Sequence, residues 1–435
     1  MFAMKSTFQT MVLALALNGL FTGSASADYG EKSDDAETTL EVVVSPGAKA
    51  LEPMAVPEAR CTDAPRAACR QLTSVIRRNM LLSFFVRVQP PRSYLADPET
   101  ETLQAPNWQD WANIGARYLI KAEVKGPAPY RVEGRLYSVP NKAEVPIKQA
   151  IFTEVPDRSL RKTAHAFSNS VIEALTGVPG VYGTRIAYAA RVAPGVKSIG
   201  VVDMDGARRG ALVSNGSINM LPSWGLGGVL YTSFKQGKPD IYFGKRKLSR
   251  DAGHYRKVAA SRDGGRIIAS ISYGGQSDLY LIGKDGKVLK NLTRTGADEV
   301  SPSFSPDGSK IAFVSNAAGG PQIYMMSSGG GAQTRLTHAG DYNYAPDWGP
   351  NGLIAFSGMD AGVSDVFTVT EGGTINRLTQ NQGSNRYPSW SANGRYVAFA
   401  SSRPKARGIW LMSADGRYQY RIAAGGAPSN LAWQR

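Results

Sequence analysis

The sequence has few of the residues that carry metal-binding or nucleophilic chemistry. Its 435 residues include only two cysteines and three histidines. His165, His254 and His338 fall in separate predicted elements, and no histidine lies near either cysteine. A metal site needs several such ligands close together, so none is expected. The G-x-S-x-G pattern of α/β-hydrolases is also absent. These absences argue against a metalloenzyme and against a serine hydrolase.

Long apolar runs are scarce too. The one candidate is Met11–Leu17, which follows Lys5 and precedes the small residues 25–27. A short apolar run before a small-residue cleavage site is typical of a secretory signal peptide. The run is too short for a membrane-spanning helix, and no basic stop-transfer residues follow it. We therefore predict a signal peptide at 1–27, cleavage between Ala27 and Asp28, and no transmembrane segment in the mature chain.

Residues 28–39 contain little apolar material and show no periodicity. Such a segment cannot bury enough apolar surface to order itself, so we expect it to be flexible. It is either an inert leader or a tether that folds on a partner. Its acidic residues are Asp28, Glu31, Asp34, Asp35 and Glu37.

The two cysteines, Cys61 and Cys69, are close in sequence. In an oxidising compartment they would close a small disulfide loop. Two free buried thiols are the alternative, and the sequence does not decide between them.

The formal net charge of +15 raises the question of nucleic-acid binding. The basic residues are scattered over predicted turns, for example at 245–247 and 403–407. Aromatic residues are not interleaved with them, as binding to single-stranded nucleic acid would require. A solvated basic exterior is the preferred interpretation, and no nucleic-acid partner is expected.

Glycine and proline are plentiful, and the sequence repeats. The 47 glycines and 25 prolines suit a chain of short strands and turns. A tight turn followed by an apolar strand occurs at 260–272, 301–315, 348–357 and 390–401. Each copy is followed by a strand with a central aromatic residue: Tyr280, Tyr324, Phe367 and Trp410. These aromatics are spaced by roughly 43 residues, the length of a four-stranded β-propeller blade.

Two less regular blades precede these four copies. The tail, residues 427–435, repeats the opening of a blade without the rest of it. We expect this tail to pair beside Thr184–Tyr188, which would leave no free sheet edge in the ring. The sequence therefore predicts an all-β, six-bladed β-propeller over 183–435, closed by its C-terminal strand.

Residues 40–177 show a mixture of strand and helix patterns, which predicts an α+β N-terminal domain. The last helix is expected to start with a cap at Asp157 and to stop at Gly177. Strands are predicted at 40–44, 84–88, 118–124, 130–137 and 147–155, and further helices at 67–82 and 108–115.

Two stretches resemble one known family. Arg161–Tyr188, RKTAHAFSNSVIEALTGVPGVYGTRIAY, resembles the corresponding segment of the TolB family, the periplasmic propellers of the Tol-Pal system. Trp108–Ile120, WQDWANIGARYLI, is similar to a helix and strand of that family. The resemblance covers nearly the whole mature chain. It implies a periplasmic, non-catalytic scaffold without a cofactor, which supports outer-membrane integrity and constriction of the outer membrane during cell division.

The resemblance also implies partners. The propeller would bind the peptidoglycan-associated lipoprotein Pal at one mouth of its channel, and the mature N-terminus, with its five acidic residues, would bind TolA. Other outer-membrane proteins are further candidate partners. Pal contacts in the family come largely from loops just before the inner strand of each blade. Here those positions are His254, Tyr255, Arg256, Lys257, Asp298, Glu299, Val300, Ser301, Asn343, Tyr344, Asn385, Arg386 and Tyr387. The third blade departs from the family pattern, because it has Val258-Ala259-Ala260 in place of Pro-x-aromatic.

The alternative is an exported propeller enzyme, a hydrolase or lyase that acts on cell-envelope polymers. Such an enzyme needs paired carboxylates, a metal cluster or a nucleophile with its base. The sequence shows none of these patterns.

Overall fold

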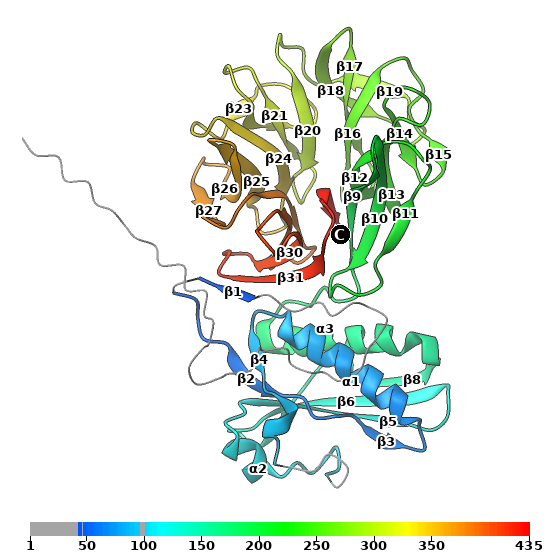
Figure 1. Cartoon of the computed structure of the whole chain (residues 1–435), viewed down its shortest axis with the longest axis vertical. Coiled ribbons are helices and arrows are strands. Elements are labelled where there is room, and N and C mark those ends of the chain that lie inside the picture. Colours follow the sequence, from blue (N-terminus) through cyan, green and yellow to red (C-terminus); the bar gives the residue numbers. More distant parts are fainter. Residues whose placement is uncertain (1–41, 46, 96–100) are drawn as a thin grey trace, which may run out of the picture.

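A computed structural model of the chain describes residues 42–45, 47–95 and 101–435. A β-propeller and a smaller α+β domain lie next to each other (Figure 1). The predicted signal peptide, its cleavage site and the acidic leader lie outside the described residues. Within the described part of the chain, no helix is long and apolar enough to cross a membrane.

Six sheets surround the propeller channel, as predicted from the repeat. The innermost strands contact one another in a closed cycle, β12 to β16, β20, β24, β28, β32 and back to β12. In blades 1 to 3 the strands are β32 Ser429–Trp433, β9 Arg185–Ala193, β10 Val196–Asp203, β11 Gly210–Val213; β12 Asn219–Gly225, β13 Gly228–Ser233, β14 Asp240–Phe243, β15 Arg246–Lys247; and β16 His254–Ala260, β17 Ile267–Tyr273, β18 Gln276–Ile282, β19 Val288–Asn291. In blades 4 to 6 they are β20 Glu299–Phe304, β21 Lys310–Ser315, β22 Gln322–Ser327, β23 Thr334–Arg335; β24 Tyr342–Trp348, β25 Ile354–Asp360, β26 Val363–Val369, β27 Ile375–Arg377; and β28 Asn385–Trp390, β29 Tyr396–Ser401, β30 Gly408–Ser413, β31 Tyr418–Ala424.

The C-terminal strand closes the ring. In the antiparallel pair β32–β9, Ser429 lies opposite Ala189 and Trp433 opposite Ile186. The backbone N–H of Trp433 donates to Ser389 Oγ of blade 6 at 2.9 Å, and its indole Nε1 donates to Thr184 Oγ1 at 2.8 Å. Strand β32 therefore completes blade 1 and bonds to blade 6 at the same time, which confirms the predicted closure.

Glycines in the turn before the outermost strand allow neighbouring blades to approach closely. Gly286 of blade 3 has a φ of 89°, and a Cβ added there would lie 1.6 Å from the carbonyl oxygen of Leu248 in blade 2. Gly206 repeats this contact between blades 1 and 6: its φ is 88°, and an added Cβ would lie 2.1 Å from the carbonyl oxygen of Ile422. Both the backbone conformation and the close approach require glycine at these positions.

The N-terminal domain is a seven-stranded sheet covered by helices. Its strands run in the order β4-β2-β5-β6-β7, with β3 also paired to β5 and β8 to β6. Helices α1 and α3 lie between this sheet and the propeller (Figure 1). The elements are β2 Glu52–Ala55, β3 Arg60–Thr62, α1 Arg66–Leu81, β4 Val86–Val88, η1 Pro91–Ser93, α2 Trp108–Asn113, β5 Tyr118–Lys125, β6 Tyr130–Ser138, β7 Ala143–Val145, β8 Ile151–Val155, η2 Asp157–Ser159 and α3 Leu160–Thr176.

The prediction that a strand at 40–44 begins the N-terminal sheet is wrong. Strand β1, Val42–Val44, pairs antiparallel with β31 and adds a fifth strand to blade 6, with Val42 opposite Tyr420. Val44 is 51% exposed, so this is an edge strand and not a buried one. A short apolar run does not show which sheet a strand will join, because any open edge offers the same backbone hydrogen bonds.

The predicted cap at Asp157 is wrong as well, whereas the predicted stop is confirmed. Asp157 lies in η2, and its carboxylate accepts a hydrogen bond from the Tyr130 hydroxyl at 3.1 Å. Helix α3 begins at Leu160 without a side-chain cap. At the other end Gly177 has a φ of 74°, and its N–H donates to the carbonyl oxygen of Glu173 at 2.7 Å.

Charged and aromatic contacts join the two domains. Arg161 of α3 forms an ion pair with Asp205 of blade 1, and the Nε of Arg78 donates to the Asp205 carbonyl oxygen at 3.0 Å. Phe84 packs its ring 5.3 Å from that of Tyr420 and 5.5 Å from that of Tyr396. One core of buried apolar residues continues from the N-terminal sheet into blades 1 and 6. The N-terminal domain is thus fixed to the wall of the ring.

His165 lies in this domain interface, and its burial is expected to make the free energy of unfolding depend on pH. Its ring is only 3% exposed, Nδ1 lies 3.1 Å from the Asn79 amide, and Nε2 lies 3.9 Å from the Asp205 carboxylate. Burial lowers the pKa of His165 to about 4, although Asp205 acts in the opposite direction. The unfolded chain therefore binds a proton more readily than the folded chain between about pH 6.5 and pH 4.

This contribution to stability is complete above about pH 6.5 and is lost as the pH falls toward 4. We expect the free energy of unfolding to decrease by about 3 kcal/mol over that window, which urea unfolding at a series of pH values would measure. His165→Gln should flatten the pH dependence, whereas His338→Gln, at an exposed position, should not. An unchanged slope in His165→Gln would contradict this assignment.

Candidate functional site

The inner strands β16, β20, β24 and β28 lie side by side around the channel, and their first residues gather at one mouth. We call this end the first mouth. Of the residues predicted there, His254 and Arg256 are exposed. The half-buried ones are Asp298, Val300, Ser301, Tyr344, Arg386 and Tyr387.

An aromatic cluster spans blades 5 and 6 at this mouth. The ring of Tyr344 packs edge-on against those of Tyr342 at 5.2 Å and Tyr387 at 5.7 Å. The Tyr344 hydroxyl lies 3.2 Å from Ser364 Oγ, which helps to hold its ring in place. Arg386 precedes Tyr387 in β28, so a cation adjoins the cluster. Rigid aromatic rings beside arginine are frequent anchors in protein interfaces.

Four other predicted contacts lie inside the blades. Tyr255, Glu299, Asn343 and Asn385 are each at most 3% exposed. They are occupied by internal bonds: the Tyr255 hydroxyl donates to Asp251 at 2.9 Å, and the Asn343 amide donates to Gln322 at 2.7 Å. Burial raises the pKa of Glu299, whose carboxyl accepts from Thr295 at 2.7 Å and from Ser315 at 3.1 Å. In this structure these side chains connect strands and are not available at the surface.

A bulge separates Lys257 from the other predicted contacts. The register of pairing between β16 and β17 shifts between Tyr255 and Val258. Arg256 and Lys257 lie in this bulge and have no regular partner residues in β17. Lys257 is half-buried and lines a cavity at the opposite end of the channel. Similar shifts interrupt the other five inner strands.

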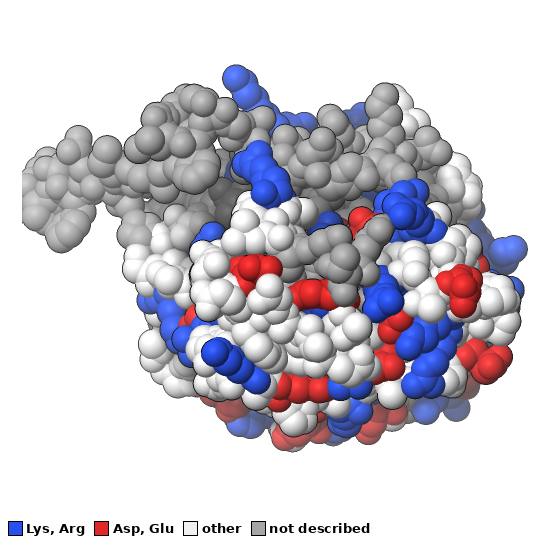
Figure 2. All heavy atoms as spheres, turned by 90° about the horizontal axis from the view of Figure 1, so that it is seen from below, with Lys and Arg blue, Asp and Glu red and all other residues white. Residues whose placement is uncertain are grey.

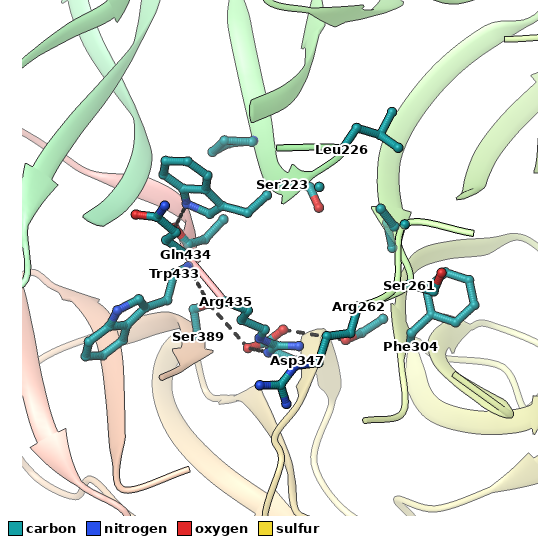
Figure 3. Close-up of a pocket in the computed structure, with 18 of the residues that line it drawn as sticks. Ser223, Leu226, Ser261, Arg262, Phe304, Asp347, Ser389, Trp433, Gln434 and Arg435 are labelled. Carbon is teal, nitrogen blue, oxygen red and sulfur yellow. Dashed lines mark hydrogen bonds and ion pairs between the residues drawn. The ribbon is translucent and has the colours of Figure 1, made fainter. Parts of the chain in front are cut away.

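That cavity, of about 680 Å³, lies where the inner strands end, which we call the second mouth. Figure 3 shows side chains of several blades around an open space, with Asp347 and Arg435 together and Leu226 across from them. Asp347 is held by the backbone N–H of Trp390 at 2.7 Å, by Ser389 Oγ at 3.2 Å and by the Arg435 guanidinium. Of the residues predicted to contact a partner, only Lys257 lines this cavity. Most of the other lining residues lie at the ends of the inner strands and in the turns that follow them.

Two further predictions concern cysteines and charge. Cys61 and Cys69 are joined by a disulfide bond, with their Cα atoms 6.1 Å apart.

On the face of the N-terminal domain that points away from the propeller, acidic and basic residues are interspersed (Figure 2). Ion pairs such as Arg135–Glu144 and Lys125–Glu123 lie in this domain. A mixed surface of this kind is unlike the single basic stripe of a nucleic-acid-binding domain.

Comparison with known proteins identifies the family. Residues 172–435 match the model of the TolB beta propeller domain, and residues 40–145 match that of the TolB amino-terminal domain. The chain belongs to the TolB family. The resemblance seen in the sequence is thereby confirmed.

Relatives of this chain include proteins named Tol-Pal system protein TolB. The Tol-Pal system protein TolB of Anaeromyxobacter dehalogenans (strain 2CP-1 / ATCC BAA-258) is 38% identical over 274 residues, 60% of this chain and 62% of that relative. That of Anaeromyxobacter sp. (strain K) is 38% identical over 302 residues, 67% of each chain. The chain thus matches about three fifths of the length of the first relative. A solved structure of TolB from Acinetobacter baumannii has a TM-score of 0.75 at 23% identity and covers 91% of this chain and 98% of that one, which shows a shared fold.

Proposed function

We propose that this chain is an exported, non-catalytic scaffold of the Tol-Pal system in the periplasm. Its first mouth binds the lipoprotein Pal, and its mature N-terminus binds TolA. A protein that holds both partners would link the outer membrane to an inner-membrane complex, and so support outer-membrane integrity and constriction during division. The observation that carries the proposal is the first mouth of a TolB-family ring, where the half-buried Arg386 adjoins a tyrosine cluster and the exposed side chains of His254 and Arg256 lie across the channel.

The side chains at this mouth suit a protein partner. His254 and Arg256 are exposed on blade 3, and Arg386 adjoins Tyr344 and Tyr387 across the channel. Interface hot spots are rich in arginine and tyrosine, and they cluster near the centre of the contact. Loops from several blades that meet at one axis can present such residues to a single partner surface.

The position of β1 supports a role for the segment before it. Strands alternate in direction through blade 6, and β1 is antiparallel to β31, so β1 runs in the same direction as β28. Strand β1 therefore begins at the first-mouth end of blade 6. The acidic residues proposed to contact TolA precede this strand in sequence. Deletion of residues 28–39 is expected to abolish TolA binding.

The double variant His254→Ala/Arg386→Ala should weaken Pal binding. Loss of two hot-spot side chains costs at least about 2 kcal/mol, or roughly a 30-fold increase in Kd. Isothermal titration of the mature protein with the periplasmic domain of Pal would measure this change. The matched control is Arg262→Ala at the second mouth, which removes an exposed arginine and should leave the affinity unchanged. If the folded parent protein does not bind Pal at all, the proposal is wrong.

A further inference from the structure

The second mouth is a separate cavity that the proposed Pal site does not use. Its walls come from the ends of the inner strands and the turns that follow them, and from the C-terminal residues of β32. Its volume of about 680 Å³ is in the range of ligand-binding pockets, which is about 300–1,000 Å³. The first mouth, where His254 and Arg386 lie, is at the other end of the same strands.

The acidic side chains of the cavity are already occupied. Asp347 accepts hydrogen bonds from Trp390 and Ser389 and is paired with Arg435, so this carboxylate and this guanidinium neutralise each other. Asp263 belongs to its own turn, where it accepts from Ser261 Oγ at 2.5 Å and from the Gly265 N–H at 2.9 Å. These hydrogen bonds lower the pKa of Asp263 and fix its negative charge inside the turn.

Four basic side chains of the cavity remain without such a partner. They come from blades 2 and 3: Arg246, Lys257, Arg262 and Lys284. Among the described residues, none of these four side chains makes a hydrogen bond or an ion pair with another side chain. Arg246, Arg262 and Lys284 are exposed, whereas Lys257 is half-buried at the end of the channel.

Lys257 makes the cavity favourable to an anion. Burial lowers the pKa of its ammonium group, so its charge is poorly solvated where it stands. Asp347 opposes this shift, but Arg435 reinforces it. An anion beside Lys257 would replace the lost solvation, because a half-buried charge gains more from an opposite charge than an exposed one does.

The remaining walls are apolar. Leu226 stands at the tip of the turn between β12 and β13 and faces the open space in Figure 3. Trp224 is half-buried, and its indole donates to the Ala432 carbonyl oxygen at 2.9 Å, which fixes its ring at the cavity wall. Phe304 and several prolines complete the lining. Apolar rings and prolines next to unpaired cations suit a ligand that carries both carboxylates and an apolar side chain.

We propose that the second mouth binds an acidic peptide segment, extended across blades 2 and 3, with carboxylates on Arg246, Lys257, Arg262 and Lys284 and an apolar side chain against Trp224 and Leu226. The segment belongs to a partner protein, and its binding is independent of the first mouth. The charge complementarity selects a peptide rich in aspartate and glutamate.

The test uses a fluorescein-labelled five-residue peptide with four carboxylates around a central leucine, and the same peptide with the carboxylates replaced by amides. Fluorescence anisotropy with the full mature protein measures both affinities. The acidic peptide should bind at least about tenfold more tightly than the amide peptide, since each lost charge pair contributes modestly and the effects accumulate. Its affinity should also fall between 50 and 300 mM salt, because such pairs are screened.

The double variant Arg246→Gln/Arg262→Gln should weaken binding of the acidic peptide about tenfold or more. Lys245→Gln/Lys287→Gln is the matched control: it removes two exposed charges from the same blades, outside the cavity lining, and should change the affinity less than about threefold. All four substitutions are at exposed positions, so both variants should fold, as their thermal unfolding midpoints would show. The first variant should still bind Pal as the parent does.

Equal affinity for the acidic and amide peptides would overturn the proposal, and so would an unchanged affinity in the cavity variant. Sedimentation with phosphatidylglycerol vesicles provides the second arm. If Arg246 and Arg262 govern binding to these vesicles while the acidic peptide does not bind, the ligand is a lipid surface and the proposal is wrong.

Discussion

Trp433→Ala is expected to lower the free energy of unfolding by about 3–5 kcal/mol, as large-to-small changes of buried tryptophan do. The side chain of Trp433 is 2% exposed and packs with its ring 6.3 Å from that of Tyr396. The substitution also removes the indole hydrogen bond to Thr184 and leaves a void between blades 1 and 6. Strand β32 contacts β28 of blade 6 and β12 of blade 2. The loss of the Trp433 side chain should therefore weaken the contacts of blade 1 with both neighbouring blades. Urea unfolding followed by circular dichroism would measure the change.

Trp224→Ala is the matched control for this prediction. It removes the same side chain from a half-buried position on the same side of the ring. Less apolar surface is lost there, so we expect a decrease of no more than about 2 kcal/mol. Equal, small effects of the two substitutions would show that β32 does not hold the ring closed.

Gly286→Ala should be nearly as destabilising, by about 2–5 kcal/mol, for two reasons that add. Its φ of 89° is strained for any residue with a Cβ, which costs about 1–2 kcal/mol. The added methyl group would also lie 1.6 Å from the Leu248 carbonyl oxygen, so blades 2 and 3 would have to move apart. Overpacking of this kind costs about 1–3 kcal/mol more. The same unfolding measurement applies.

Gly274→Ala separates the two causes. Gly274 has a similar φ of 73°, but an added Cβ there would meet no atom within 4 Å. Its substitution should therefore cost only the backbone strain, about 1–2 kcal/mol. The difference between the two variants measures the contact between blades. If the two variants are equally stable, the close approach at Gly286 contributes nothing.

The propeller was readily predicted because its signals are local and repeated. The spacing of Tyr280, Tyr324, Phe367 and Trp410 marks one strand in each of four blades, and the tail at 427–435 lacks the rest of a blade. The N-terminal domain was harder to predict, because none of its strands belongs to a sequence repeat. Strands β2, β3 and β7 were missed, being only three or four residues long. The sheet joined by β1 was also mistaken, since a three-residue apolar strand has no preference between two open edges.

Some of the residues predicted to contact a partner at the first mouth are exposed and others are buried. The alternation of side chains along a strand does not predict which are which. Asn343 of β24 and Asn385 of β28 are each bonded to a polar side chain of the preceding blade, Gln322 and Asp365 respectively. A bulge then shifts the register in the middle of the strand, so Lys257 reaches the far end of the channel. At four of the six bulges a left-handed residue, such as Ser301 or Tyr387, directly precedes a proline, but the β16 bulge has neither feature. The proline was therefore an available signal in the other blades, but not for Lys257.

The pairing of β32 with β9 also determines when the ring can form during synthesis. Ser429 and Ala189, which face each other in that pair, are 240 positions apart in the chain. Within the propeller domain, strand β9 emerges first, yet its partner β32 emerges last. Blade 1 therefore stays incomplete, with an open edge, until β32 has been synthesised. Contacts between such distant residues form slowly, so the unfinished ring exposes an aggregation-prone edge at the stage when folding factors would have to shield it.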